Sequence, residues 1–197
     1  MRFNFGQRRE GPVLPGKLEI AELHRFHPGV PEAQSTYYTS AAAVCLHRHH
    51  TSPKPVMVTL DTASDSYDAE WNEPTAAETR GLANKDEATR DGAYCIALAA
   101  AHAHLQRIAL RRSEGLTGAD WYLVPSDAEV GDDLEMDLER TDIVRLEVSG
   151  VDLDDDAKML GRLNEKLRQA RKGKSAFPAY AGVVGFRGAR VQFAKVL

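Results

Sequence analysis

The clearest pattern of apolar positions along the chain begins near residue 85. From there, small and apolar side chains recur every three or four residues, which predicts a helix of about twenty residues. This pattern contains Ala88, Asp91, Cys95, Leu98, Ala99, His102 and Leu105. A second helix is predicted over residues 154–172. Its apolar stripe consists of Ala157, Leu160, Leu163, Leu167 and Ala170.

Between and after these two helices, the pattern changes to that of strands. Strands are predicted over residues 108–110, 119–124, 143–149 and 180–186, with a further one over residues 191–196. In the third of them, apolar and polar side chains alternate, so that Arg145, Glu147 and Ser149 share one face. The order from residue 85 is helix, three strands, helix, strand. We expect one sheet with the helices on opposite faces and the strand after the second helix parallel to an earlier strand.

The first 84 residues have a weaker pattern. Residues 1–16 are rich in Gly, Pro and Arg, and we expect a flexible arm there. Residues 17–84 predict an α+β extension with a strand over 18–23, a helix over 36–49, a hairpin of strands 56–61 and 67–71, and a helix over 74–83. The fold class is therefore α/β, with this extension placed before a core over residues 85–197.

Two carboxylates stand out because each lies on an otherwise apolar strand. These are Asp120 and Glu147. Burying an unpaired carboxylate is costly, so two of them on consecutive strands suggest a shared divalent metal. A magnesium ion held by two carboxylates leaves room for water and a phosphate oxygen, which is the arrangement that phosphodiester cleavage needs. The alternative is that both acids lie on edge strands and face water.

Composition and charge narrow the class of protein. The chain has 197 residues, of which 43% are hydrophobic and 27% charged, with a net charge of −4, as in an ordinary globular protein. No apolar run reaches the roughly 18 residues of a membrane span. The first residues lack the apolar stretch of a secretory signal, and Cys45 and Cys95 lie in alanine-rich helical segments. We therefore expect reduced thiols in a cytoplasmic protein.

The charge is unevenly distributed. Residues 127–142 are strongly acidic, whereas residues 162–174 carry six Lys and Arg side chains, namely Arg162, Lys166, Arg168, Arg171, Lys172 and Lys174. The basic cluster fits either a local phosphate-binding face or a solvated helix end that balances the acidic loop.

The order of elements, the segment Thr117-Gly118-Ala119-Asp120-Trp121-Tyr122-Leu123 and the triplet Glu147-Val148-Ser149 resemble the PD-(D/E)xK restriction-endonuclease-like nuclease superfamily. The resemblance covers about residues 85–187. It implies a restriction-endonuclease-like core and a hydrolase that cleaves nucleic acid with Mg²⁺ or Mn²⁺, DNA being favoured over RNA. Bacterial defence or DNA repair is the setting it implies. Asp120 and Glu147 would then be the two metal ligands.

One position departs from the superfamily pattern. The lysine that usually stands two residues after the second acid is replaced by Ser149. Lys166 on the second helix is the best substitute, and Gln169 would share part of its surface. An acid from the first helix, Asp91 or Glu87, would complete the site. If no cation substitutes, the alternative is a non-catalytic binding or assembly module that keeps the fold, or a plain structural protein.

The histidines at the end of the predicted helix over 36–49 also invite a metal hypothesis. His47, His49 and His50 cluster there, with Cys45 close by in the sequence. No matching pair of zinc-ligand residues occurs elsewhere, so we interpret them as histidines favoured by the negative end of the helix dipole. The sequence leaves the oligomeric state, a homodimer and protein partners open.

Overall fold

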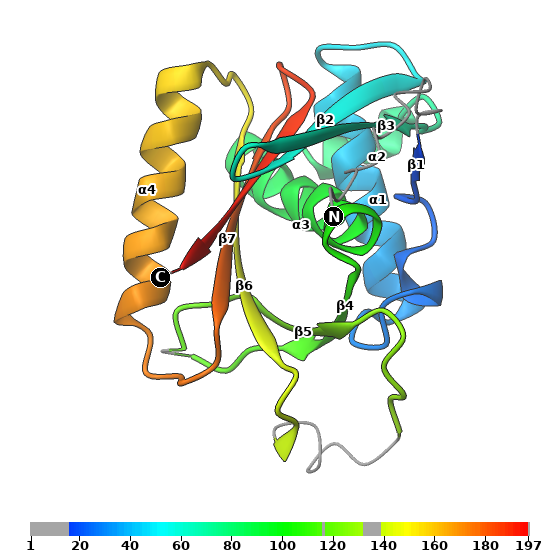
Figure 1. The fold of residues 1–197 in the computed structure, drawn as a ribbon. Helices are drawn as coiled ribbons and strands as arrows, with labels where there is room; N and C mark the ends of the chain where they lie inside the picture. Colours follow the sequence, from blue (N-terminus) through cyan, green and yellow to red (C-terminus); the bar gives the residue numbers. More distant parts are fainter. Residues whose placement is uncertain (1–15, 116, 132–138, 197) are drawn as a thin grey trace, which may run out of the picture.

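One mixed sheet runs through the chain from its first described strand to its last. The computed structural model describes residues 16–115, 117–131 and 139–196, and in it eight strands form the order β1-β3-β2-β8-β7-β6-β5-β4 (Figure 1). Their bounds are β1 Gly16–Leu18, β2 Lys54–Leu60, β3 Ala63–Ala69, β4 Arg107–Arg112, β5 Trp121–Pro125, β6 Val144–Val151, β7 Ala179–Gly185 and β8 Arg190–Val196.

The strand directions follow the lengths of the connections. β4, β5 and β6 pair antiparallel in sequence order, and β7 pairs antiparallel with β8. β7 pairs parallel with β6, because the helix α4 (Asp156–Lys172) crosses over between them. This confirms the parallel pairing predicted for the strand after the second helix. β2 pairs parallel with β8 and antiparallel with β3, so the N-terminal extension continues the same sheet.

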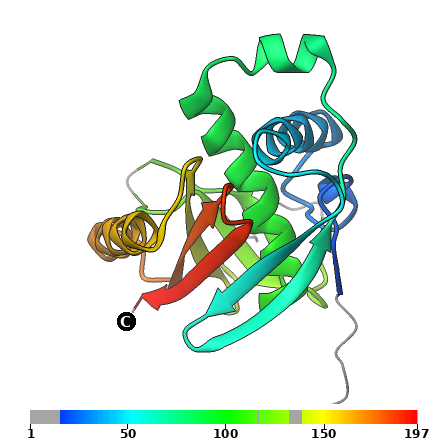
Figure 2. The same ribbon diagram turned by 90° about the horizontal axis from the view of Figure 1, so that it is seen from above.

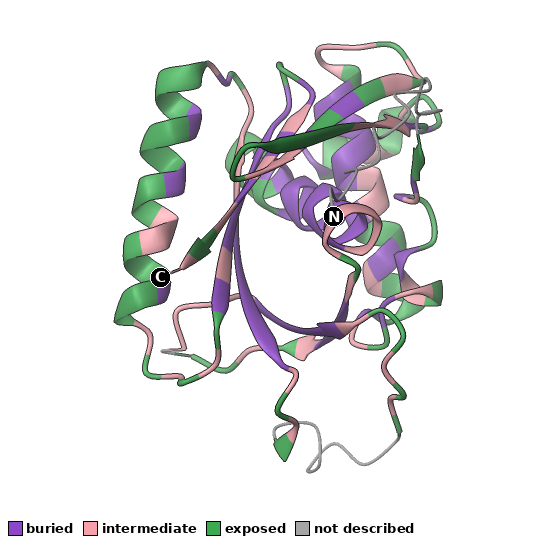
Figure 3. Ribbon diagram, in the orientation of Figure 1, coloured by how far each residue is buried: buried purple, intermediate pink, exposed green. Residues whose placement is uncertain are grey.

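The helices lie on both faces of the sheet. α3 (Lys85–Leu105) packs against one face, and α1 (Glu32–His47) packs on α3, while α4 covers the other face (Figures 1 and 2). Two short helices, η1 (Leu23–Arg25) and α2 (Ala76–Gly81), flank α1. Figure 3 shows the consequence for burial: α3 is buried nearly all round, whereas the outer side of α4 is exposed.

Alternating side chains divide the core between the two faces of the sheet. Leu146 and Val148 of β6 belong to the larger cluster, which includes α3 and α1. Ala181 and Val183 of β7 instead pack with Met159 and Leu163 of α4. α3 and α1 approach closely, since a Cβ on Gly92 would lie 3.0 Å from the backbone of Ala41. The larger core is therefore shared by both parts of the chain.

The structure corrects two of the predicted elements near the N-terminus. The strand expected over residues 18–23 is wrong: β1 ends at Leu18, where Ile20 N donates to Leu18 O, and Leu23 begins η1. The helix expected over residues 36–49 begins four residues earlier, at Glu32 after Pro31. Apart from Gly16, the expected flexible arm lies outside the described residues, as does the 132–138 part of the acidic loop.

A buried histidine links this N-terminal region to β4 and makes folding stability depend on pH. His27 is 1% exposed, and its Nδ1 accepts a hydrogen bond of 2.9 Å from Ala109 N. Burial, assisted by nearby His102, lowers the pKa of His27 from 6.5 to about 3. The unfolded chain therefore binds a proton that the folded chain refuses, so stability falls as pH drops below 6.5.

We expect the free energy of unfolding to fall by up to about 1.4 kcal/mol per pH unit between pH 6 and 4 from this residue. His27→Asn keeps an acceptor for Ala109 N but cannot be protonated in this range. In this variant, the contribution of His27 to the pH dependence of the free energy of unfolding should therefore disappear. Urea unfolding at several pH values measures this dependence. Parallel profiles for the wild type and the variant would contradict the assignment.

Candidate functional site

The candidate site lies where β5 and β6 separate. β5 pairs with β6 only up to Trp121 and Leu146, whereas β6 continues to Val151 beside β7. Asp120 occupies the gap just before β5. Its backbone N donates to Leu146 O at 2.9 Å, and its side-chain Oδ2 accepts from Val148 N at 2.8 Å. The carboxylate thus takes the acceptor position that a strand would otherwise fill.

The second oxygen of Asp120 is held from α3. Tyr94 Oη donates to Asp120 Oδ1 at 2.6 Å, and Tyr94 is 6% exposed. Burial, followed by the negative charge of Asp120, raises the pKa of Tyr94, so that its hydroxyl remains a donor. Asp120 is therefore fixed by β6 and α3 together.

Glu147 projects from β6 toward α4. It is 3% exposed, and its Oε1 accepts from Lys166 Nζ at 2.7 Å, while the same amine lies 3.2 Å from Gln169 Oε1. Burial and then the charge of Asp120 raise the pKa of Glu147, against the opposing effect of Lys166. The lysine therefore does not fully offset the cost of placing this acid beside a second one.

Two adjoining cavities open on this group. They share Asp120, Glu147 and Gln169, so they form two parts of one cleft. The first part, of about 460 Å³, is also lined by Arg112, Ser113, Glu114, Gly115, Gly118, Ala119, Lys172 and Gly173. The second part, of about 440 Å³, is also lined by Asp86, Thr89, Arg90, Tyr94, Val148, Ser149, Gly150, Arg162 and Lys166.

Close backbone contacts fix the segment around Gly118, which lines the 460 Å³ part of the cleft. Gly118 has a φ of 67°, which favours glycine, and a Cβ there would lie 2.7 Å from Gln169 O. Arg145 fastens the same region, donating to the carbonyl oxygens of Thr117, Ala170 and Phe177 at 2.6, 3.2 and 2.9 Å. Arg145 is thus buried among these contacts on the α4 side of the sheet, the side to which Glu147 also projects, as the alternation along β6 predicts.

Four of the six residues predicted for the site come together: Asp120, Glu147, Lys166 and Gln169. Asp91 does not join them. It is 4% exposed, and its carboxylate turns toward α1, accepting from Tyr37 Oη at 3.0 Å and from Arg90 Nε at 2.8 Å. Glu87 is exposed near the start of α3 and lines neither part of the cleft. The structure therefore places Asp91 and Glu87 outside the cleft, and not in the site where one of them was expected.

The sequence patterns did not single out Tyr94, Arg90 and Arg112, which also line the cleft. Tyr94 lies three residues after Asp91, so the helical periodicity could have placed it one turn further along the same face. Arg112 ends β4, and the antiparallel β4–β5 hairpin pairs it with Trp121, the residue after Asp120. Hairpin register was the signal that could have found it.

The two histidines that follow α1 link its end to other segments. His49 Nε2 lies 2.9 Å from Asp152 Oδ1, and His50 Nε2 lies 2.8 Å from Phe186 O. Within the described parts of the chain, no group of three or more His, Cys, Asp or Glu side chains is arranged to hold a metal ion.

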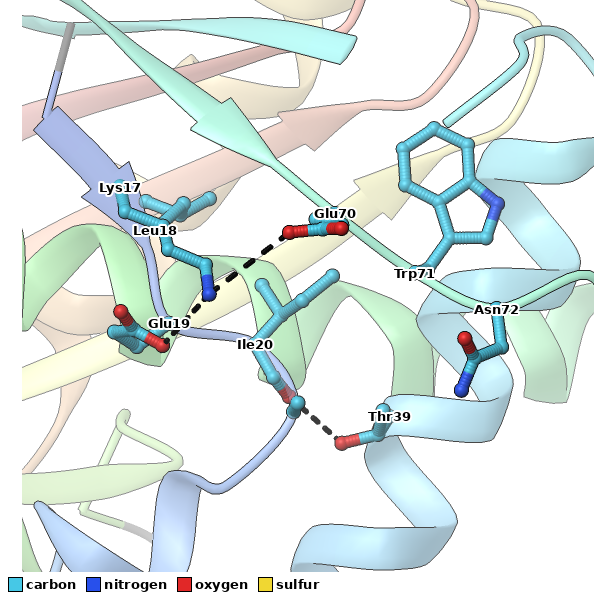
Figure 4. A pocket seen from close by; sticks show the side chains of 9 residues that line it. Lys17, Leu18, Glu19, Ile20, Thr39, Glu70, Trp71 and Asn72 are labelled. Atoms are coloured by element: carbon cyan, nitrogen blue, oxygen red, sulfur yellow. Dashed lines mark hydrogen bonds and ion pairs between the residues drawn. The ribbon is translucent and has the colours of Figure 1, made fainter. Parts of the chain in front are cut away.

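A further cavity of about 200 Å³ lies near β1, β3 and α1 (Figure 4). Its single lysine lies between its two acids, since Lys17 Nζ is 3.7 Å from Glu19 and 4.0 Å from Glu70. Thr39 donates to the Ile20 carbonyl at 2.7 Å. Neither of its acids is buried as Glu147 is, so the β5–β6 cleft remains the candidate site.

Comparisons with protein-family models, with curated proteins and with solved structures found no match to this chain. None of the helices in the described part of the chain is both long enough and apolar enough to span a membrane.

The Tyr94–Asp120 hydrogen bond should contribute measurably to stability. Tyr94→Phe leaves a carboxylate oxygen short of a donor, so we expect the free energy of unfolding to fall by about 1–2 kcal/mol. Urea unfolding at pH 7 measures this loss. Tyr37→Phe is the matched control, because Tyr37 is 48% exposed and also donates to an aspartate. Its loss should stay within about 0.5 kcal/mol, and equal losses would contradict the special role of Tyr94.

Proposed function

We propose that the protein cleaves phosphodiester bonds in nucleic acid, DNA in preference to RNA, with Mg²⁺ or Mn²⁺. The observation that carries the proposal is the convergence of Asp120, Glu147 and Lys166 on one open cleft. The element order and the parallel β6–β7 pairing support a restriction-endonuclease-like core. The proposal rests on this chain's geometry together with the resemblance of its motifs.

The donor set suits a hard divalent cation. Two carboxylates from neighbouring strands face the cleft, and their mutual repulsion contributes to the raised pKa of Glu147. Magnesium commonly binds through one or two carboxylates and keeps several waters, so a two-acid site is sufficient. The bound ion would polarise a phosphate oxygen and make water a stronger nucleophile. Asp120 and Glu147 would hold it, and Tyr94 and Val148 N would keep Asp120 oriented.

Lys166 supplies the positive charge that the superfamily pattern assigns to the missing lysine. Its amine lies between Glu147 and Gln169, and its side chain, which is 16% exposed, lines the cleft. From there it can stabilise negative charge on the phosphate as that charge develops in the transition state. Gln169 positions the amine through the 3.2 Å contact. Ser149 lines the same part of the cleft and cannot supply a charge.

A second candidate function is a non-catalytic nucleic-acid-binding or assembly module. Two observations favour it: Ser149 stands where the lysine is expected, and the Lys166 amine is engaged by Glu147 at 2.7 Å. Such a module would keep the Lys and Arg side chains that line the cleft and would bind nucleic acid without cleaving it. The two functions are distinguished by cleavage assays on DNA and RNA with Mg²⁺ or Mn²⁺.

The cellular setting of the proposal is a reducing compartment. Cys45 and Cys95 are both buried and unpaired, and burial raises their pKa to about 11 and about 12. Such thiols are unreactive and do not require an oxidising environment. This supports a cytoplasmic protein, with defence or DNA repair as the proposed setting.

Glu147→Gln tests the metal site directly. The change keeps the shape and an oxygen that can accept from Lys166 but removes the charge that a divalent ion needs. We expect Mg²⁺-dependent cleavage to fall at least about 100-fold. Calorimetric titration with Mg²⁺ gives a readout apart from activity, and the wild-type affinity should weaken as pH is lowered toward the raised pKa of Glu147. Unchanged cleavage and Mg²⁺ binding in the variant would remove Glu147 from the site.

Lys166→Ala and Ser149→Ala separate an enzyme with a displaced lysine from a binding module. We expect the first variant to lose orders of magnitude in cleavage rate and the second to lose little. Single-turnover cleavage rates measure the difference, and oligonucleotide affinity shows whether binding survives. A fully active Lys166→Ala would contradict the assigned role of Lys166. A wild-type protein that binds but never cleaves would favour the module.

A further inference from the structure

We propose that the part of the cleft beside Arg112 is a phosphate-binding subsite, which holds a phosphate of the nucleic-acid strand next to the one being cleaved. The inference rests on the proposed function, because the subsite adjoins the proposed metal-binding acids. It adds a specific ligand group and a specific anchor residue, which neither the motif pattern nor the acid pair identifies.

Arg112 is held in place by aromatic rings. Its guanidinium carbon lies 4.7 Å from the ring centre of Tyr94 and 4.6 Å from that of Trp121. Both rings are buried, and the Tyr94 ring is itself fixed through its hydroxyl bond to Asp120. Stacking on two aromatic rings restrains the side chain, and a side-chain hydrogen bond with Tyr94 engages part of the guanidinium, which leaves its other N–H groups for a ligand.

The charge of Arg112 is not consumed by a close carboxylate. Among the described residues its ion pair is with Asp120 Oδ1 at 3.9 Å, beyond hydrogen-bond distance, and that oxygen already accepts from Tyr94. The Arg112 side chain is 43% exposed and lines the 460 Å³ part of the cleft. A restrained, partly exposed guanidinium without a bidentate partner is well suited to a phosphate group, whose oxygens match its paired donors.

Lys172 faces the same part of the cleft from the C-terminal end of α4. It is exposed, and within the described chain its amine makes no ion pair or hydrogen bond. The acid nearby, Glu114, is already engaged: its two oxygens accept from Arg111 at 2.8 Å and from Tyr122 at 3.1 Å. The cations of this part are therefore available to an anionic ligand.

The two parts of the cleft together define a path for a strand. Arg90, Arg162 and Lys166 lie in the part on one side of the acid pair, and Arg112 and Lys172 in the part on the other. A phosphate at the acid pair would thus have a neighbouring phosphate within the Arg112 part. The ligand is either an internal phosphodiester or a terminal phosphate of the strand, since both present the same oxygens.

Binding in EDTA tests the subsite without cleavage. A fluorescein-labelled single-stranded DNA is titrated by anisotropy with the full-length wild type and with Arg112→Gln. The matched control is Arg25→Gln, an exposed arginine outside the cleft lining that is paired with Glu22. We expect Arg112→Gln to weaken binding at least tenfold and Arg25→Gln less than twofold. Equal affinities for Arg112→Gln and wild type would overturn the proposal, as would no binding by the wild type.

A second readout locates the contact. The chain has two tryptophans, and Trp71 Nε1 is buried without a hydrogen-bond partner in the described structure, so Trp71→Phe removes no hydrogen bond. In this background, Trp121 reports on Arg112 directly. We expect the DNA to change its emission saturably, and Arg112→Gln to abolish that change. Emission unchanged at saturating DNA would overturn the subsite.

Lys172→Ala tests the same subsite in case the Arg112 variant misfolds, because Lys172 is exposed and its side chain makes no ion pair or hydrogen bond within the described chain. We expect it to weaken DNA binding two- to fivefold, and an unchanged affinity would overturn its part in the subsite.

The state of the DNA end distinguishes the two kinds of phosphate. If DNA with a 5′-phosphate binds tenfold tighter than DNA with a 5′-hydroxyl, the ligand is a terminal phosphate, and equal affinities assign an internal one. DNA binding through Arg112 without any cleavage retains the subsite and refutes the nuclease.

Discussion

The site depends on the two hydrogen bonds that the carboxylate of Asp120 accepts. One oxygen accepts from Val148 N in the gap where β5 leaves β6, and the other accepts from Tyr94 on α3. A strand edge in a buried sheet must find acceptors for its N–H groups, and here a side chain provides one. The same bonds that close the sheet therefore orient the carboxylate, so the geometry of the site is set by the fold.

The second acid is held under different conditions, and the charges around it explain why. Glu147 is buried next to Asp120, and Lys166, which donates a hydrogen bond to it, does not prevent its pKa from rising. A buried carboxylate beside a second, partly buried one, with incomplete compensation, favours the arrival of further positive charge. A divalent ion bound to the two acids would lower this electrostatic cost, and so would the cations that line the cleft. The phosphates of a nucleic-acid strand would in turn balance the positive charge of those cations.

Local patterns were sufficient to predict most of the core from the sequence. The long helix α3, the alternating strand β6 and the amphipathic α4 each carry their own periodicity, and α4 as a crossover required the parallel β6–β7 pairing. The strand expected over residues 18–23 failed because β1 is a three-residue edge strand whose end is decided by pairing with β3. Short edge segments carry too few residues for a periodic signal.

The site residues divide along the same line. The directions of Glu147 and Lys166 were predictable because strand alternation and helix periodicity fix which way each one faces. Asp120 lies one residue before β5, and its carboxylate is oriented by Val148 N and Tyr94. Asp91 could not be placed in this way: its helical position agrees with Tyr94, but a hydrogen bond from Tyr37 turns its carboxylate toward α1. Side-chain direction within a shared helix face is decided by partners from distant parts of the chain.

This division also determines which acid can report on chemistry alone. Asp120 accepts the Val148 N–H and the Tyr94 hydroxyl, so removing its carboxylate disturbs the sheet gap and the contact with α3 as well as any metal. Among the described residues, Glu147 accepts one side-chain hydrogen bond, from a lysine that also reaches Gln169, and a neutral amide can preserve that bond. A loss of activity at Asp120 would therefore mix structural and chemical effects, whereas one at Glu147 isolates the charge. The acid that the fold requires least is the better probe of what the cleft does.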